Sequence, residues 1–410
     1  MTSDAGNVSA SDFVVGDLPK PETYYHRMPD INAPTEYVEG VLDIANEGSG
    51  LLRPKFAASE SDVYISASQI RRFGLRVGDL VGGQARAPKD NERFWGLLKV
   101  EKINSREVTE EMVPTRRIDV DDMTVIYPNE KITLATDKET LTTRIIDLIS
   151  PIGFGQRALI VSAPKAGKTW LTKDIITGIA KNYPDRAHIM AVLIGERPEE
   201  VTDIKRHLKE VTGGKGEVAA SNFDESPADQ TRVGELALER AKRLVEEGRD
   251  VVIILDSITR MARAYNMSIP NSGRTLSGGF DPVALFPAKK FFGAARKIED
   301  GGSMTIIGTC LVETGSRMDD LIYEEFKGTG NMELHLVRSL AEKRIFPAID
   351  VAKSGTRQEE LLYTKDEYPK IVLLRRMIDL LNEDERTESL LARLKKAETN
   401  EEFLDNLKKA

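Results

Sequence analysis

The segment from Ala158 to Trp170, ALIVSAPKAGKTW, constrains the fold most, because an apolar run ends there in a loop suited to hold phosphates. Gly167, Lys168 and Thr169 match the end of the P-loop pattern GxxxxGK followed by Ser or Thr, although Ser162 stands where the pattern has its first glycine. ALIV predicts a buried parallel strand, and WLTKDIITGIAKNY predicts a helix whose N-terminus would face the phosphates. The alternative is a chance glycine-lysine-threonine turn, which the strand before it and the helix after it disfavour.

Composition sets outer bounds on the protein class. The 410 residues, 40% of them apolar and 30% charged, suffice for two or three globular domains. The net charge of −8 argues against a basic coat over the whole surface, so nucleic acid would have to bind at local basic surfaces. Cys310 is the one cysteine, which excludes an intramolecular disulfide and fits a reducing compartment. Because neither a leader pattern nor a membrane span is evident, we expect a cytoplasmic protein.

The chain divides by pattern into four parts. Residues 1–35 are polar and proline-punctuated, which predicts a flexible arm. Residues 36–115 contain short strands separated by turns, namely YVEGVLDIA, GLLRP, DVYIS, GDLVGGQARAP and RFWGLLKVEKI, which predict a small all-β barrel. Residues 116–145 read as a linker. Residues 146–410 alternate strands with helices, so we expect an α/β domain with the strands ALIVS, AHIMAVLIG, GEVAAS, VVIILD and MTIIGT, followed by packing helices.

Two carboxylates end predicted strands of the α/β domain. Asp256 follows the buried run VVIIL and is a candidate magnesium partner beside the phosphate loop, unless it is an ordinary strand-ending aspartate. Glu196 ends AHIMAVLIG and is suited to polarise an attacking water, with Arg197 beside it; alone, it could equally be a solvated loop residue. In parallel sheets such strand ends meet at one edge, so both side chains are expected near the P-loop.

A larger set of blocks resembles the bacterial transcription termination factor Rho family. These are, in this order, VSAPKAGKT, LIGERPEEVTD, VVIILDSITRMARAYN, LSGGFDP, FFGAARKIEDGGSMTIIGT, YEEFKGTGNMELHL, AEKRIFPAID and SGTRQEELL. The resemblance as a whole spans residues 36 to 380. The resemblance implies a RecA-like P-loop ATPase domain preceded by an OB-fold barrel, a homohexameric ring, and ATP with Mg²⁺ bound between neighbouring subunits.

The resemblance also implies roles for residues of the ATP site. Glu196 would activate water, Lys168 would neutralise phosphate charge, and Thr169 with Asp256 would hold Mg²⁺, partly through water. Arg357 and Arg344 would reach the neighbour's nucleotide. The residues expected to line the nucleotide are Gly153, Phe154, Gly155, Gln156, Arg157, Ala158, Lys165, Ala166, Gly167, Lys168, Thr169, Trp170, Arg197 and Phe346; for Phe346 a place in the core is an equal alternative.

Single-stranded RNA would bind at two places, by the same resemblance. The central-pore site would comprise Arg274, Thr275, Leu276, Ser277, Gly278, Gly279 and Arg317, although sequence alone favours plain connectors there. The barrel site would comprise Gly48, Ser49, Gly50, Leu51, Leu52, Arg53, Asp62, Val63, Tyr64, Glu92, Arg93 and Phe94.

Within the barrel site the side chains divide by chemistry. Tyr64 and Phe94 would stack bases, Arg53 and Arg93 would meet phosphates, and Asp62 or Glu92 would accept from an exocyclic amine such as that of cytosine.

This chain departs from the family pattern in the barrel, where GFGFLR appears as GSGLLR. Ser49 and Leu51 therefore replace two aromatics, which forfeits roughly 1–3 kcal/mol of stacking for each base that loses its partner. Trp95 either compensates or belongs to the barrel core. We expect the helical subdomain that commonly precedes the barrel in the family to be shortened here to an arm.

The combined reading is an ATP-dependent RNA translocase and helicase that binds nascent transcript and dislodges RNA polymerase. Two alternatives come from other classes. An RNA-independent RecA-like ring ATPase would have a regular GxxxxGKT loop and no stacking residues on its barrel. An RNA-binding protein without turnover would be expected to lack some of Glu196, Lys168, Asp256 and Arg357, all of which are present.

Overall fold

The computed structural model describes residues 34–45, 47–108, 117–382 and 385–407. The predicted arm lies outside the described residues except at its end, as do residues 109–115 of the predicted barrel. From Thr35 onward the chain forms one compact unit. No helix in the described ranges is long and apolar enough to cross a membrane.

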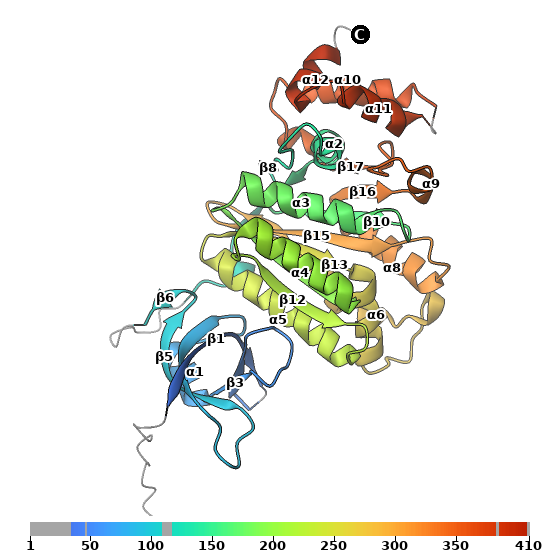
Figure 1. Ribbon diagram of the computed structural model, residues 1–410. Helices are drawn as coiled ribbons and strands as arrows, with labels where there is room; N and C mark the ends of the chain where they lie inside the picture. Colours follow the sequence, from blue (N-terminus) through green and yellow to red (C-terminus); the bar gives the residue numbers. More distant parts are fainter. Residues whose placement is uncertain (1–33, 46, 109–116, 383–384, 408–410) are drawn as a thin grey trace, which may run out of the picture. The chain divides into compact units, whose positions relative to one another are not determined.

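The first domain is a small closed β-barrel, as predicted (Figure 1). Its order is β3-β2-β1-β4-β5-β6, and a further pairing of β3 with β5 closes the barrel. The strands run β1 (Thr35–Ile44), β2 (Gly50–Arg53), β3 (Val63–Ile65), β4 (Leu80–Arg86), β5 (Trp95–Ile103) and β6 (Arg106–Glu107). Side chains alternate between faces along each strand, so the fully buried Leu42, Leu52, Ile65 and Val81 fill the interior.

A short helix between β3 and β4 was not predicted. Helix α1 (Ala67–Phe73) begins with a capping box, in which the Ser66 side chain accepts from the backbone of Gln69 and the Gln69 side chain accepts from the Ser66 backbone. Gly74 ends it in a left-handed conformation. The signals for this helix are the capping-box pattern from Ser66 to Gln69 and the glycine at position 74, where the helix ends; both lie among strand-like runs.

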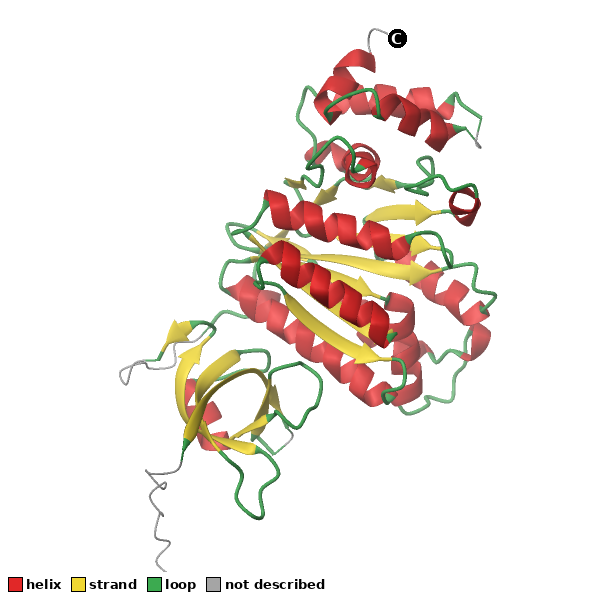
Figure 2. Ribbon diagram, viewed as in Figure 1, coloured by secondary structure: helices red, strands yellow, loops and turns green. Residues whose placement is uncertain are grey.

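The second domain is built on a mostly parallel sheet, as predicted (Figures 1 and 2). Its main order is β12-β11-β13-β15-β10-β16-β17, with β14 and β7 attached beside β15. The five predicted strands are confirmed as β10 (Arg157–Ser162), β11 (Ala187–Glu196), β12 (Glu217–Asn222), β13 (Asp250–Asp256) and β15 (Ser303–Leu311). The remaining strands are β14 (Arg296–Ile298), β16 (Met332–Leu336) and β17 (Gly355–Thr356).

Helices cover both faces of this sheet because its central strands are apolar on both sides. Along β13, Val252 and Ile254 pack into one core, and Val251 and Ile253 pack into the other. The first core also takes α3 (Lys168–Asn182) and α4 (Pro198–Thr212). The second takes α5 (Pro227–Glu246), α6 (Ile258–Ser268), α7 (Pro282–Gly293) and α8 (Arg317–Lys327).

Residues 116–145 were expected to form a linker, and this is corrected by the structure: the described part of the segment belongs to the α/β domain. Ile132 and Leu134 are fully buried in that domain's core. Strand β7 (Val125–Ile126) pairs with β14, and β8 (Lys131–Ile132) pairs with β9 (Ile152–Gly153). Helix α2 (Leu141–Ile149) begins before the predicted boundary at 146. Strands of two residues are too short to show a periodicity, so they could not be predicted from the residue pattern.

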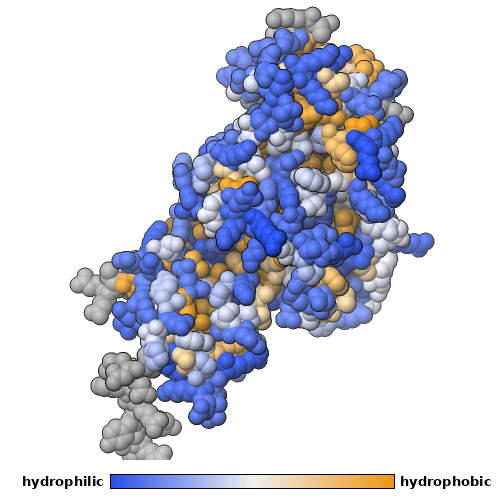
Figure 3. Space-filling model, in the orientation of Figure 1, coloured by the Kyte–Doolittle hydropathy of each residue, from blue (hydrophilic) through white to orange (hydrophobic). Residues whose placement is uncertain are grey.

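The C-terminal helices are confirmed as packing helices. They are α10 (Tyr368–Asp379), α11 (Arg386–Leu394) and α12 (Asn400–Asn406), drawn red in Figure 1. Ile371, Leu390 and Phe403 join the same core as α3. Short elements complete the domain: η1 (Val120–Asp122), η2 (Ser277–Gly279), α9 (Arg338–Glu342) and η3 (Glu359–Leu361). Most of the face drawn in Figure 3 is hydrophilic, with apolar residues in small groups.

Candidate ATPase and RNA-binding sites

The phosphate-binding loop connects the end of β10 to the start of α3. Gly167 has φ 96° and caps the helix, and Lys165 also has a positive φ of 65°. Ser162, at the position of the pattern's first glycine, is the last residue of β10, is buried, and donates from its hydroxyl to the Ala163 carbonyl. A side chain is tolerated there because the residue still has the extended conformation of a strand.

The predicted carboxylates meet the P-loop lysine. Lys168 Nζ lies 2.6 Å from Asp256 Oδ1 and 3.7 Å from Glu196 Oε1. Asp256 ends β13 and Glu196 ends β11, so two parallel strands deliver both groups to the same sheet edge. Thr309 on β15 donates to the same Asp256 oxygen at 2.8 Å. The expectation that Lys168, Glu196 and Asp256 form one cluster is confirmed.

The electrostatics of this cluster prepare Glu196 to exchange a proton near neutral pH. Burial, and after it the nearby Asp256, raise the pKa of Glu196 to about 7, against the opposing effect of Lys168 and Arg260. Burial alone would lower the pKa of Lys168, but the carboxylates of Asp256 and Glu196 outweigh burial and raise it. A buried carboxyl whose pKa lies near the working pH is suited to act as a general base.

An aromatic pocket lies beside the P-loop. Phe346 and Trp170 are 50% and 76% exposed and line a cavity of about 460 Å³ together with Gly167. The Phe346 ring lies 3.5 Å from where a Cβ on Gly167 would stand. Of the two readings left open for Phe346, the structure favours the exposed aromatic over a core residue. Arg197, the N-cap residue of α4, is exposed and pairs with Glu200 at 3.7 Å.

The segment Gly153–Ala158 lies away from the P-loop, which corrects its expected place around this chain's own nucleotide. It precedes or begins β10, whose six residues span about 20 Å, whereas the P-loop follows the strand. Phe154 is fully buried, and a Cβ on Gly155 would lie 2.5 Å from the Lys297 backbone. Gln156 donates to the Asn331 carbonyl and side chain. These residues form packing contacts.

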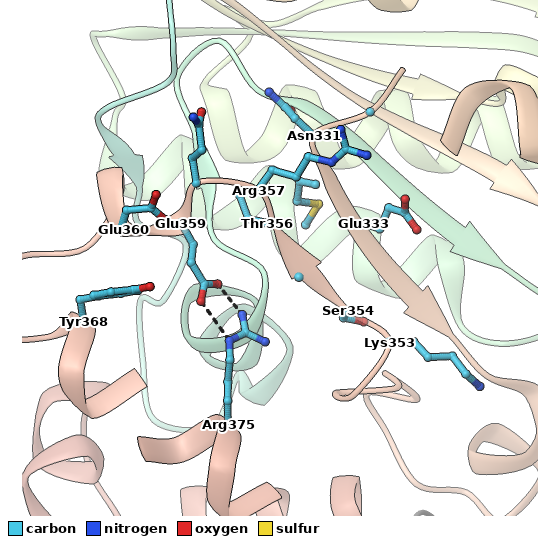
Figure 4. Close-up of a pocket in the computed structure, with 14 residues that line it drawn as sticks. Asn331, Glu333, Lys353, Ser354, Thr356, Arg357, Glu359, Glu360, Tyr368 and Arg375 are labelled. Carbon is cyan, nitrogen blue, oxygen red and sulfur yellow. Dashed lines mark hydrogen bonds and ion pairs between the residues drawn. The ribbon is translucent and has the colours of Figure 1, made fainter. Parts of the chain in front are cut away.

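The same end of the sheet holds Arg357. Its backbone N–H donates to the Asn331 carbonyl, and it lines a cavity of about 550 Å³ shown in Figure 4. Figure 4 shows Arg375 reaching Glu359 from below while Arg357 points away from that ion pair. Within the described residues, the exposed Arg357 guanidinium has no hydrogen-bonding or ionic partner.

Arg344 and Arg357 do not lie together. Arg344 follows α9 and stands two residues before Phe346, at the P-loop end of β16, whereas Arg357 bonds to Asn331 at the other end of that strand. Their placement does not support the expectation that both reach the same neighbouring nucleotide.

The two predicted pore segments are brought into contact. Gly278, in η2, has φ 73°, and a Cβ there would lie 2.5 Å from the Met318 nitrogen. Arg317 begins α8 and is exposed, as are Arg274, Thr275 and Ser277. Asp319, also on α8, is buried and accepts hydrogen bonds from Arg263 Nε at 2.8 Å and Arg263 Nη2 at 2.7 Å. Because Arg263 is on α6, which follows Asp256, this ion pair joins the loop region to the ATP-site strand.

On the barrel, four members of the predicted site line one pocket. Tyr64, Glu92, Arg93 and Phe94 surround a cavity of about 350 Å³. The Arg93 guanidinium lies 5.1 Å from the centre of the Phe94 ring. Proteins bind single-stranded nucleic acid by stacking its bases on aromatic side chains and by attracting its phosphates to cationic groups, and this pocket has both kinds of group.

Several other predicted barrel residues are buried or already paired within the barrel. Asp62 is 1% exposed and accepts from the Ser59 hydroxyl at 2.9 Å, so of the two proposed acceptors only Glu92 is at the surface. Arg53 is held by Asp43 at 2.8 Å, and Leu52 and Val63 are core residues. Gly48, Ser49 and Leu51 are partly exposed, whereas Gly50 is buried.

Comparison with known proteins assigns both domains. The RNA-binding domain of the Rho termination factor matches residues 38–109, and the nucleotide-binding domain of the ATP synthase alpha/beta family matches residues 142–356. The chain is 54% identical over 373 residues to the transcription termination factor Rho of Bacillus subtilis, covering 90% of this chain and 84% of that protein. It belongs to the Rho family.

Further Rho proteins are similarly close. The Pseudomonas aeruginosa protein is 50% identical over 377 residues, covering 90% of this chain and 88% of its own, and the Thermotoga maritima protein is 52% identical over 369, covering 89% and 84%. Among solved structures, an ATPase of the type III secretion system has a TM-score of 0.59 at 22% identity, covering 75% of this chain and 94% of its own. At that identity it shows a shared fold.

The replacement of an aromatic by Leu51 does not remove the barrel pocket. Leu51 pairs across the strands with Tyr64, so the lost aromatic position lies beside the pocket and does not line it. Trp95 packs against the barrel core, which decides between its two readings.

Sequence reasoning missed two arginines. Arg260 places Nε 3.1 Å from Glu196 and donates to the Gly195 carbonyl at 2.6 Å. It stands four residues after Asp256 on the helix that follows that strand, a spacing that could have indicated its place. Arg86 lines the barrel pocket and pairs with Glu92; nothing in its spacing to Glu92 marked the contact.

Proposed function

We propose that this chain is an ATP-driven RNA translocase and helicase that terminates transcription by displacing RNA polymerase from the transcript. The observation that carries the proposal is the joining, in one chain, of a stacking pocket in a Rho-type RNA-binding domain and an ATPase cluster of lysine with two carboxylates. The relatives' names support termination as the outcome of that motor.

The ATP site supports a specific sequence of events. Lys168 neutralises Asp256 and Glu196 in this structure. An arriving triphosphate competes for the Lys168 ammonium, which leaves Glu196 next to a strong negative charge and raises its tendency to take a proton. Glu196 then accepts a proton from the attacking water while the water oxygen bonds to the γ-phosphorus. The bond between the γ-phosphorus and the bridging oxygen of the β-phosphate breaks.

Magnesium fits the same site. The Thr169 hydroxyl in the first turn of α3 and the Asp256 carboxylate are hard oxygen ligands of the kind Mg²⁺ prefers, and they would hold it with phosphate oxygens and water. When bound, Mg²⁺ neutralises charge on the β- and γ-phosphates.

A ring assembly, with six subunits by family analogy, would complete the site. The free Arg357 guanidinium lies at the end of β16 opposite the P-loop, so it can serve a nucleotide only on another subunit. Such an arginine stabilises the charge of the transferring phosphoryl group. Gly278 and Arg317 would contact RNA in the pore of that ring. The assembly would work in the cytoplasm.

The proposed function is tested with stalled RNA polymerase complexes carrying a long, cytosine-rich, unstructured transcript. ATP should release the transcript, and a nonhydrolysable ATP analogue should not. The Lys168→Ala variant is the matched control, since it keeps the RNA pocket and loses the P-loop charge. Full release with the analogue, or none with ATP despite ATP hydrolysis, would overturn the assignment of an ATP-driven termination factor.

A further inference from the structure

The barrel pocket is lined by Arg86, a residue that no motif in the sequence pointed to. Gly96 on β5 lies between two cross-strand neighbours, Tyr64 on β3 and Arg86 on β4. Because Gly96 has no side chain, the pocket floor stays open between the Tyr64 ring and the Arg86 guanidinium; a Cβ there would stand 3.7 Å from that guanidinium. Glu92, Arg93 and Phe94 close the pocket from the loop before β5.

Arg86 grips Glu92 with both of its terminal nitrogens. Nη1 donates to Oε2 at 2.6 Å and Nη2 donates to Oε1 at 2.7 Å, the parallel two-bond geometry in which arginine binds a carboxylate best. The Lys89 backbone donates a third bond to Oε2 at 3.1 Å, and Arg86 Nη1 also donates to the Ala87 carbonyl at 3.0 Å. The carboxylate of an otherwise exposed loop residue is therefore fixed in position.

These contacts determine what the pocket edge offers a base. The hydrogen bond from Arg86 and the backbone bond from Lys89 lower the pKa of Glu92 to about 2, so the group is ionised and accepts only. A carboxylate has about four acceptor sites, and three are filled by Arg86 and Lys89. What remains is acceptor capacity at one edge of a pocket that Tyr64 and Phe94 flank.

We propose that Arg86 is a positioning residue that sets the base specificity of the barrel pocket by holding Glu92 as a fixed hydrogen-bond acceptor. A base edge that carries an amine, as cytosine does, would donate to that acceptor. A base edge that carries a carbonyl oxygen at the same place, as uracil does, would be repelled. The inference rests on the proposed RNA binding of this pocket and adds to it a residue and a reason for selectivity.

The geometry separates this role from simple attraction to phosphate. Lysine at position 86 keeps the positive charge but cannot make two parallel bonds to a carboxylate. The Arg86→Lys variant should therefore keep its overall attraction to RNA and lose discrimination between bases. Arg93→Gln is the matched contrast, since Arg93 is exposed and makes no hydrogen bond to Glu92 in the described structure. This substitution should weaken the binding of every RNA to the same extent.

The experiment measures binding of the full chain to fluorescent oligocytidylate and oligouridylate of equal length, at fixed salt and without nucleotide. The parent should prefer oligocytidylate by about tenfold or more. Arg86→Lys should bring that ratio below about threefold and change oligouridylate affinity by less than about twofold. Glu92→Gln should lose the preference too, and the double variant should lose no more than either single one, because the two residues act as a unit.

The outcomes separate the inference from the proposed function. An Arg86→Lys variant that keeps the parent's ratio would overturn the positioning role, as would a parent that binds both RNAs equally. A parent that binds neither RNA would instead overturn the RNA-binding function itself. Because Glu92 is an exposed loop residue, Glu92→Gln keeps the test decisive if the Arg86 variant fails to fold; a Glu92→Gln variant that retained the preference would overturn the inference.

Discussion

Replacing Glu196 by glutamine should abolish ATP turnover and remove one limb of its pH dependence. In the parent, the pKa of about 7 makes Glu196 roughly 9% ionised at pH 6 and 91% ionised at pH 8. Since kcat/KM follows the ionisation of a base in the free enzyme, it should rise about tenfold across that interval. The glutamine variant should lose about 10²–10⁴-fold in kcat and show no such rise.

The same substitution should make the protein more stable at high pH. The folded-state pKa of Glu196 is raised above its unfolded value near 4.5, so the group favours the folded state at low pH. That contribution is lost as pH rises through about 7, at a total cost of up to about 3 kcal/mol. The parent should therefore lose stability between pH 5 and pH 8 relative to the glutamine variant, a trade of stability for activity.

Both effects are measured on purified protein. Phosphate release is followed against pH with saturating RNA, and the free energy of unfolding is measured by denaturant titration at pH 5 and pH 8. Glu200→Gln is the matched control, since Glu200 lies near the site on α4 and its carboxylate pairs with Arg197. It should keep the pH limb. A Glu196→Gln variant that turned over within a factor of ten of the parent, or that kept the limb, would refute the catalytic assignment.

Three further predictions follow from single contacts. Arg357→Ala should lose about 10³-fold or more in kcat, but mixing it with inactive Lys168→Ala subunits should restore turnover, because mixed interfaces pair an intact P-loop with an intact arginine; no restoration would argue against action between subunits. Gly278→Ala should abolish stimulation of hydrolysis by RNA while RNA-free hydrolysis stays within about twofold, since its Cβ would lie 2.5 Å from the Met318 nitrogen at a φ of 73°; normal stimulation would show that this loop contact is dispensable. Leu51→Phe should tighten RNA binding about fivefold or more by adding a stacking face beside Tyr64, and unchanged affinity in a titration would mean that no base reaches that position.

The long elements could be predicted from sequence because burial on both faces leaves continuous apolar runs. VVIILD and ALIVS are β13 and β10, and the carboxylates that end β13 and β11 reach the P-loop as expected. A parallel sheet brings the carboxyl ends of its strands to one edge, so chain order was enough to place these groups.

Features that depend on pairing across the fold could not be predicted. Strands β7 and β8 are two residues long and are defined by backbone bonds to distant segments, so their region read as a linker. Asp62 was expected to accept from a base, but it is buried and accepts from the Ser59 hydroxyl, a contact that depends on how the folded barrel places the loop before β3. The grip of Arg86 on Glu92 depends on the shape of the loop between β4 and β5, which spacing alone does not specify.

Whether RNA drives this ATPase is best decided by measuring phosphate release from ATP. Three reactions are compared: no nucleic acid, cytosine-rich single-stranded RNA, and DNA of the same sequence. We expect strong stimulation by the RNA alone, which would also show that Ser49 and Leu51 still permit loading. Equal hydrolysis in all three reactions would contradict this expectation and would identify a ring ATPase that works without RNA.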